Sequence, residues 1–225
     1  MSVLAPREAY RLWARSYEAE NAITHLEQGL VRALGPSPAG LCLLDAGCGT
    51  GRRLLGTRAR RAVGVDPSPE MIATGRETHA FGREVRLQVG DVRALRLPDA
   101  AFDLAWCRLV IGHLDDCRRA YRELARVTRK GGHAIVTDFH TAAHAAGHRR
   151  TFRCDGAVHE AEHHVHPAEA QIAAAGAAGL TLLEQAEAVI GPEALPFYRA
   201  KGRQALYEEH RGLPVVLALA FRRDG

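Results

Sequence analysis

The stretch Leu43-Leu44-Asp45-Ala46-Gly47-Cys48-Gly49-Thr50-Gly51 leads an apolar strand into a tight glycine turn. Glycines two apart remove the β-carbons that would keep a ligand off the backbone, and they permit the positive φ angles of a sharp strand-to-helix turn. A dinucleotide fingerprint spaces its glycines as GxGxxG. Here the third glycine comes one residue early, and an acidic residue closes the strand. The spacing therefore predicts a ligand-binding strand-turn-helix unit and disfavours a nicotinamide oxidoreductase.

Further strand-like segments follow at residues 61–66, 85–89, 102–107 and 134–137. The first ends at Asp66, 21 residues after Asp45, which is the length of one strand-helix-strand step. A carboxylate at such a strand end is placed to accept hydrogen bonds from both hydroxyls of a ribose. Strands that alternate with helices predict a parallel sheet with one large ligand site.

The second half of the chain predicts an insert on the substrate side of that sheet. A hairpin is expected over residues 151–158 with Asp-Gly at its turn. A helix over 168–178 and strands over 180–190 and 215–222 complete the pattern. Because ligands in open parallel sheets lie beyond the carboxyl ends of the strands, the segment after residue 137 is expected to face the substrate.

The glycine stretch and the segments behind it resemble the motifs of class I S-adenosylmethionine (SAM) methyltransferases. Residues 121–133 are similar to the family's "RELxRVLKPGG" helix and turn. The resemblance implies that the glycine loop passes under the methionine part of SAM, that Asp66 binds the ribose, and that Asp91 and Val92 bind the adenine. The cofactor-binding residues implied in this way are Tyr10, Trp13, Tyr17, Asp45, Gly47, Gly49, Gly51, Asp66, Asp91, Val92 and Cys107.

The N-terminal segment is similar to the "YDxWAxxYDxxxNxLxxLE" opening of ubiquinone/menaquinone-type methyltransferases. In that group the segment folds over SAM as a lid, with aromatic side chains beside the sulfonium, and a cation near aromatic faces is stabilised electrostatically. Glu18 stands where the family has Asp. A helix over 7–20 and a second over 22–34 are expected here, and core packing of the aromatic stripe stays open as the alternative.

The resemblance implies one α/β domain over residues 1–225 with a Rossmann-like, seven-stranded and mostly parallel sheet of order 3-2-1-4-5-7-6, flanked by helices on both faces. Residues 1–34 would form the helical lid, 41–138 the SAM-binding core, and 139–225 the insert with strands six and seven. A breaker-rich connector at 35–40 separates the lid from the core.

The chemistry expected is methyl transfer from SAM to a small molecule, such as a specialised metabolite, with S-adenosylhomocysteine (SAH) as product. SAM supplies an electrophilic methyl group, so the protein has to position the acceptor and, for a hydroxyl, remove its proton. A histidine suits that base role. His140, His166 and His113 are the candidates, and nitrogen or carbon as the acceptor atom remains an alternative.

Two other function classes are weighed against this one. A nucleic-acid methyltransferase acting on exocyclic amines would be expected to show Asn/Asp-Pro-Pro-Tyr/Phe after strand four, where residues 107–110 read Cys-Arg-Leu-Val, and no Pro-Cys nucleophile for cytosine occurs. A SAM-binding protein without methyl transfer stays open.

Composition agrees with an ordinary globular enzyme. The chain has 225 residues, 47% hydrophobic and 25% charged, with a net charge of +4. Its basic residues are scattered arginines with only two lysines, which does not indicate a nucleic-acid patch. No signal-peptide pattern or membrane-length apolar run is seen. A cytoplasmic monomer or homodimer, free of nucleic acid and membrane, is the expectation.

The cysteines and histidines do not predict a metal centre. Five cysteines show no CxxC pair, so reduced thiols are expected. His140, His144 and His148 are spaced by four, which would align them on one helical face. No carboxylate and amide set typical of magnesium-dependent methyltransferases accompanies them, and no metal is therefore expected.

Overall fold

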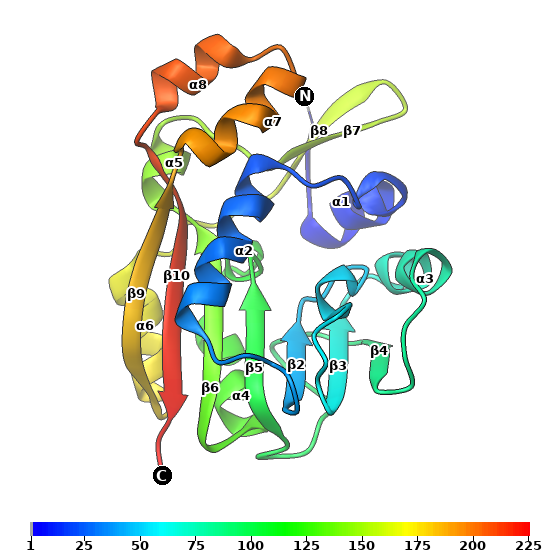
Figure 1. The fold of residues 1–225 in the computed structure, drawn as a ribbon, viewed down its shortest axis with the longest axis vertical. Helices are drawn as coiled ribbons and strands as arrows, with labels where there is room; N and C mark the ends of the chain where they lie inside the picture. The colour runs from blue at the N-terminus through cyan, green and yellow to red at the C-terminus, as the bar shows by residue number, and fades with distance from the viewer. Residues whose placement is uncertain (1) are drawn as a thin grey trace.

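Seven strands form the main sheet of the computed structural model, which describes residues 2–225 (Figure 1). The order is β4-β3-β2-β5-β6-β10-β9, and β10 runs antiparallel to both of its neighbours. The prediction of a seven-stranded, mostly parallel sheet is confirmed. The strands are β2 (Cys42–Ala46), β3 (Arg61–Asp66), β4 (Val85–Val89), β5 (Phe102–Arg108), β6 (Thr128–Phe139), β9 (Leu180–Val189) and β10 (Pro214–Arg223).

Helices cover both faces of this sheet, as predicted. Helices α2 (Ala22–Leu34) and α3 (Pro69–Thr78) pack on one face, where Leu43, Leu104 and Ile135 point. Helices α4 (Arg118–Val127) and α6 (Ala168–Ala177) pack on the other. Because successive residues of a strand face opposite sides of the sheet, each buried strand contributes side chains to the hydrophobic cores on both faces.

The glycine turn after β2 has the left-handed backbone that its sequence predicts. Gly47 and Gly49 have φ angles of 83° and 59°. A β-carbon at Gly47 would lie 2.2 Å from Val110 Cγ2, so only glycine lets the segment after β5 approach the turn. On the other side, a β-carbon at Gly75 of α3 would lie 2.0 Å from the Thr50 carbonyl oxygen. The loop is thus packed against its surroundings.

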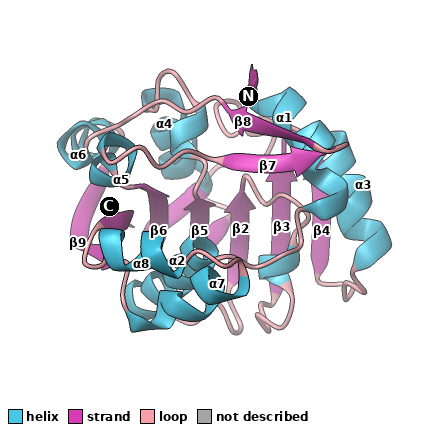
Figure 2. Ribbon diagram, turned by 90° about the horizontal axis from the view of Figure 1, so that it is seen from above, coloured by secondary structure: helices cyan, strands magenta, loops and turns pink. Residues whose placement is uncertain are grey.

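A second, three-stranded sheet lies above the carboxyl ends of the main sheet (Figure 2). Strand β1 (Ser2–Leu4) pairs in parallel with β8 (Ala157–Ala161), which pairs antiparallel with β7 (Thr151–Cys154). The hairpin has the predicted turn, with Asp155 and Gly156 both at positive φ. Helix α1 (Pro6–Trp13) packs against this sheet through Ala9. The N-terminus and the distant hairpin therefore form one cover.

This cover is narrower than the lid expected over residues 1–34. The first helix ends at Trp13 and continues as the short 3₁₀ helix η1 (Ala14–Ser16), whereas a helix was expected over 7–20. Helix α2 belongs to the core, because Leu26 packs with Val215 and Val216 of β10. Asn21 starts that helix with a capping box. Met1 lies outside the described residues.

Short elements complete the fold: η2 (Arg52–Leu54), η3 (Ile111–His113), α5 (Thr141–Ala145), η4 (Pro192–Ala194), α7 (Leu195–Ala200) and α8 (Gln204–His210). Helix α5 ends before residue 148, so the expected alignment of three histidines on one helical face is not formed. Within residues 2–225, no helix combines the length and apolarity needed to cross a membrane.

The contact between α3 and the glycine loop can be tested with two helical glycines. Gly75→Ala is expected to destabilise the protein by about 1–3 kcal/mol, because the added methyl overlaps the loop backbone. Gly29→Ala in α2 is the control, since nothing lies within 4 Å of the place that its β-carbon would take and alanine favours a helix by up to about 1 kcal/mol. Urea unfolding measures both, and equal effects of the two substitutions would contradict this packing.

Candidate functional site

A cavity of about 770 Å³ opens at the carboxyl ends of β2, β3, β4 and β5. It lies where the chain order reverses between β2 and β5, the usual ligand position in such sheets, and its volume is in the range of about 300–1,000 Å³ typical of small-molecule sites. Eight residues predicted from the sequence line it: Tyr10, Tyr17, Gly47, Gly49, Asp66, Asp91, Val92 and His113.

Asp66 ends β3 at the floor of the cavity and is only 9% exposed. One carboxylate oxygen accepts a hydrogen bond from the Gly49 amide at 2.8 Å, and the other accepts from the Ser68 amide at 2.9 Å. Burial raises the pKa of Asp66 to about 6, although these amides oppose the rise. Each oxygen keeps a lone pair for a ligand hydroxyl.

Asp45 lies fully buried at the end of β2, and neither of its carboxylate oxygens has a hydrogen-bond partner in the described chain. Burial raises its pKa. The Thr50 hydroxyl of the adjoining loop is likewise buried without a partner. Unpartnered buried oxygens are costly, but neither residue lines the cavity.

Asp91 and Val92 line the cavity beyond β4. The Arg93 side chain donates to both oxygens of Asp91 and lowers its pKa, so the group stays ionised. Val92 is buried and presents an apolar surface. Their placement beside Asp66 agrees with an adenosine site, and their binding roles stay predictions.

A buried ion pair beneath the site was not foreseen from the sequence. Arg108, which lines the cavity, donates through Nε and Nη2 to the two oxygens of Glu27, at 2.8 and 2.7 Å. The Thr137 hydroxyl and Arg53 also contact this carboxylate. Burial alone would raise the pKa of Glu27, but the arginines hold it below its ordinary value. An acid within the apolar stripe of α2 is the one signal that could have revealed the pair.

The part of the cavity lined by His113, Tyr10 and Glu162 is called the acceptor side here. His113 lies at its centre. Its Nδ1 lies 3.2 Å from the Glu162 carbonyl oxygen, which can only accept, so Nδ1 carries the proton. Nε2 then bears a lone pair, and it is met by the Tyr10 hydroxyl at 2.8 Å and by Arg150 Nη1 at 2.6 Å. Burial, followed by the charge of Arg150, lowers the pKa of His113 well below its ordinary value. The ring is therefore neutral.

Some aromatic residues of the N-terminal segment line the cavity, and others pack within the cover. Tyr10 and Tyr17 face the cavity. Trp13 does not line it, because its ring stacks on Phe152 of β7 at 4.9 Å between centroids. Burial raises the pKa of Tyr17 to about 12, so its phenol stays neutral.

Three more residues predicted to bind the cofactor lie off the cavity. Asp45 lies beneath the loop. Gly51 permits close packing, because a β-carbon added at this position would lie 2.8 Å from Leu87 Cδ2. Cys107 points into the core on the α4 side, because side chains alternate along β5, and its neighbour Arg108 faces the cavity in its place.

His140 and His166, the other histidines considered as bases, also lie away from the cavity lining. His140 follows β6 on its β10 side; its Nδ1 accepts from the Ala142 amide, and its Nε2 lies 3.3 Å from Glu187 of β9. His166 Nε2 donates to the Leu114 carbonyl oxygen at 2.7 Å. Both rings are engaged in local structure, so the structure favours His113 over them.

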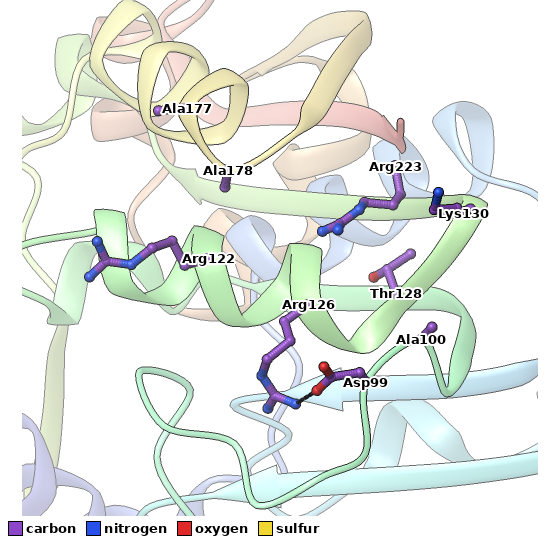
Figure 3. A pocket seen from close by; sticks show the side chains of 9 residues that line it. All are labelled: Asp99, Ala100, Arg122, Arg126, Thr128, Lys130, Ala177, Ala178 and Arg223. Carbon is purple, nitrogen blue, oxygen red and sulfur yellow. Dashed lines mark hydrogen bonds and ion pairs between the residues drawn. The ribbon is translucent and has the colours of Figure 1, made fainter. Parts of the chain in front are cut away.

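A second cavity, of about 430 Å³, lies beside α4, the last residues of α6, the start of β6 and the end of β10 (Figure 3). Basic side chains surround it, among them Arg122, Arg126 and Arg223. Arg126 lies in the last turn of α4, where a cation stabilises the helix dipole. No residue singled out from the sequence lines it. Within residues 2–225, no three acidic, histidine or cysteine side chains converge as a metal site would require.

Comparisons with known proteins find matches to the central segment. Residues 44–136 match the family model described as "Methyltransferase domain". A malonyl-[acyl-carrier protein] O-methyltransferase of Serratia marcescens is 36% identical over 130 residues, which are 57% of this chain and 50% of that protein. The match thus spans about half the length of this relative.

Solved structures agree on the fold. A SAM-dependent methyltransferase from Mesorhizobium loti superposes with a TM-score of 0.69 at 22% identity, covering 88% of this chain and 98% of its own. A [4+2]-cyclase superposes with a TM-score of 0.69 at 21% identity and covers 100% of this chain and 99% of its own. The same fold therefore also occurs in a protein named for another reaction.

The residues present fit SAM. The Asp66 carboxylate has acceptor capacity left for the ribose hydroxyls, and Gly47 and Gly49 leave the backbone open to the cavity.

Removing one partner of the buried ion pair should lower the free energy of unfolding far more than removing one partner of an exposed ion pair. Glu27→Ala leaves Arg108 and Arg53 without a counter-charge, and we expect a loss of about 3–5 kcal/mol in the free energy of unfolding. Asp116→Ala, which breaks an exposed pair with Arg118, is the control and should change little. Urea denaturation that gave similar losses for both variants would be inconsistent with the pair's role.

Cofactor affinity should depend on pH through Asp66. We expect the ribose hydroxyls of SAM to donate to the ionised carboxylate of Asp66, so affinity should rise as pH increases through about 6 and level off above. One unit below that pKa, the affinity should be about tenfold lower. Calorimetry from pH 5 to 8 measures this, and Asp66→Asn should remove the dependence. A wild-type affinity that is constant over this range would refute it.

Proposed function

We propose that this chain, whose residues 44–136 match a methyltransferase-domain model, is a SAM-dependent methyltransferase that transfers the methyl group of SAM to a hydroxyl oxygen of a small molecule. The observation that carries the proposal is the single cavity that joins the cofactor motifs to Tyr10 and His113. SAM supplies an electrophilic methyl group when bound, and the protein supplies position and proton removal.

Tyr10 and His113 handle the proton in this proposal. The Tyr10 hydroxyl donates to His113 Nε2, while Arg150 donates to the Tyr10 oxygen at 3.1 Å. An acceptor hydroxyl that donates to Tyr10 can lose its proton to Tyr10 as the Tyr10 proton moves to Nε2. Because Nδ1 of His113 carries the ring proton, Nε2 keeps the lone pair that receives it.

Two alternatives have specific support. Arg150 also reaches His113 Nε2, and when it donates there no free base remains, which suits an amine or carbon acceptor that needs only proximity. The [4+2]-cyclase of the same fold supports, more weakly, a reaction other than methyl transfer.

The acceptor class, location and assembly are also proposals. The relative named a malonyl-[acyl-carrier protein] O-methyltransferase supports an oxygen acceptor. A specialised metabolite as substrate, action in the cytoplasm without nucleic acid, and a monomeric or homodimeric state remain predictions from the sequence.

Substitution of the proton-handling pair tests the mechanism. Tyr10→Phe and His113→Asn should each lower kcat by about 10²- to 10⁴-fold, whereas His113→Asn should leave SAM affinity close to wild type. Turnover is followed as SAH formed with an acceptor identified from a small-molecule screen. His140→Asn and His166→Asn are the controls and should retain turnover. If His113→Asn and Tyr10→Phe remain fully active, transfer proceeds by proximity alone.

A further inference from the structure

Arg108 is a nearly buried cation at the end of β5, and one end of its guanidinium is open. The residue lines the large cavity although only 4% of it is exposed. Its guanidinium carbon lies 5.1 Å from the centre of the Trp106 ring, and Glu27 of α2 accepts from Nε and Nη2. Nη1 makes no hydrogen bond within residues 2–225 and is not sealed from solvent. Because the rest of the residue is enclosed, the Nη1 end opens into the cavity.

The open end of Arg108 has a defined donor geometry. A guanidinium carries five N–H donors, and Glu27 takes two of them, so two remain on Nη1 and one on Nη2. One N–H from each of these nitrogens forms the end of the group, with the spacing of the two oxygens of a carboxylate. Donors that are nearly buried and unsatisfied by the protein are costly, so an acceptor from a ligand is favoured there.

The acids beside Arg108 do not supply that acceptor. Glu27 holds the opposite edge of the guanidinium and also lies 3.4 Å from Arg53 Nη2. Asp45 interacts electrostatically with both arginines, but neither of its oxygens accepts a hydrogen bond from them. Within residues 2–225, no carboxylate besides that of Glu27 lies within 4.0 Å of the Arg108 nitrogens. The charges are therefore largely balanced, and what is missing is an acceptor for the N–H groups that face the cavity.

The cavity places Arg108 at one end of a bound SAM molecule. The strands below it follow the order β4-β3-β2-β5. Asp66 ends β3 and suits the ribose, whereas the buried Val92 beyond β4 offers an apolar surface that suits the adenine ring. The methionine end then extends over the glycine turn toward β5, where Gly47 packs against Val110. Arg108 lies there, and the α-carboxylate is the anionic group of SAM.

We propose that Arg108 binds the α-carboxylate of SAM through its free Nη1 and Nη2 hydrogens, while Glu27 holds the opposite edge of the guanidinium. This inference rests on the proposed function, because it concerns how the methyl donor of that reaction is recognised. The pair makes the cavity selective: S-adenosyl compounds that carry the carboxylate bind tightly, and those that lack it bind weakly. Glu27 fixes the plane of the guanidinium without contacting the ligand.

The test compares SAM with decarboxylated SAM, which differs from it by the carboxylate alone, in calorimetric titrations without an acceptor. The wild type should bind SAM roughly 10- to 100-fold more tightly, the range expected of hydrogen bonds to a charged group. In Arg108→Gln the preference should fall below about threefold. Arg93→Gln is the matched control, because Arg93 lines the adenosine end of the same cavity, and it should keep the preference. The double variant Glu27→Gln/Arg108→Gln removes both charges of the pair and replaces Arg108→Gln if that variant does not fold.

Three results would overturn the inference: a wild-type preference below about threefold, a preference that survives in Arg108→Gln, or an equal loss in Arg108→Gln and Arg93→Gln. SAM binding without a preference for the carboxylate would reject only the role of Arg108. A wild type that binds neither ligand would reject the proposed function, and this inference with it.

Discussion

The site depends on the carboxylate of Asp66. Its two oxygens hold the amide of Gly49 in the turn after β2 and the amide of Ser68 at the start of α3. One side chain thereby joins two strands, the glycine loop and a helix at the floor of the cavity. The close contact of Gly75 with Thr50 fixes the same loop from the other side. A rigid floor of this kind holds a cofactor in one position, which methyl transfer requires.

The cover over this floor is assembled from segments far apart in the chain. Strand β1 and helix α1 come from the N-terminus, and the β7–β8 hairpin comes from the insert after β6. Tyr10 from α1 reaches His113, which follows β5, and Arg150 joins them from the segment before β7. The cover and the acceptor side of the cavity are therefore built from the same segments.

The sequence predicts the features that depend on local pattern. Glycine spacing and strand-end acids locate the cofactor half, because strand, turn and carboxylate are neighbours in the chain. The pair of Glu27 and Arg108 joins residues 81 positions apart, and no local pattern indicates such a contact. The sequence also does not indicate which of the candidate histidines lines the cavity. His140 does end a strand, but β10 lies beside it, so its side chain turns toward β9 rather than the cavity.

The most direct test of this account is a calorimetric titration of SAM into the wild type and Asp66→Ala. The substitution removes charge-assisted hydrogen bonds to the cofactor and the anchor of the loop, so the account predicts a loss of roughly 2–4 kcal/mol in binding free energy, or about 30- to 1,000-fold in affinity. Asp115→Ala, which changes an exposed acid at the same cavity, should bind as the wild type does. Unchanged SAM affinity in Asp66→Ala would contradict the account.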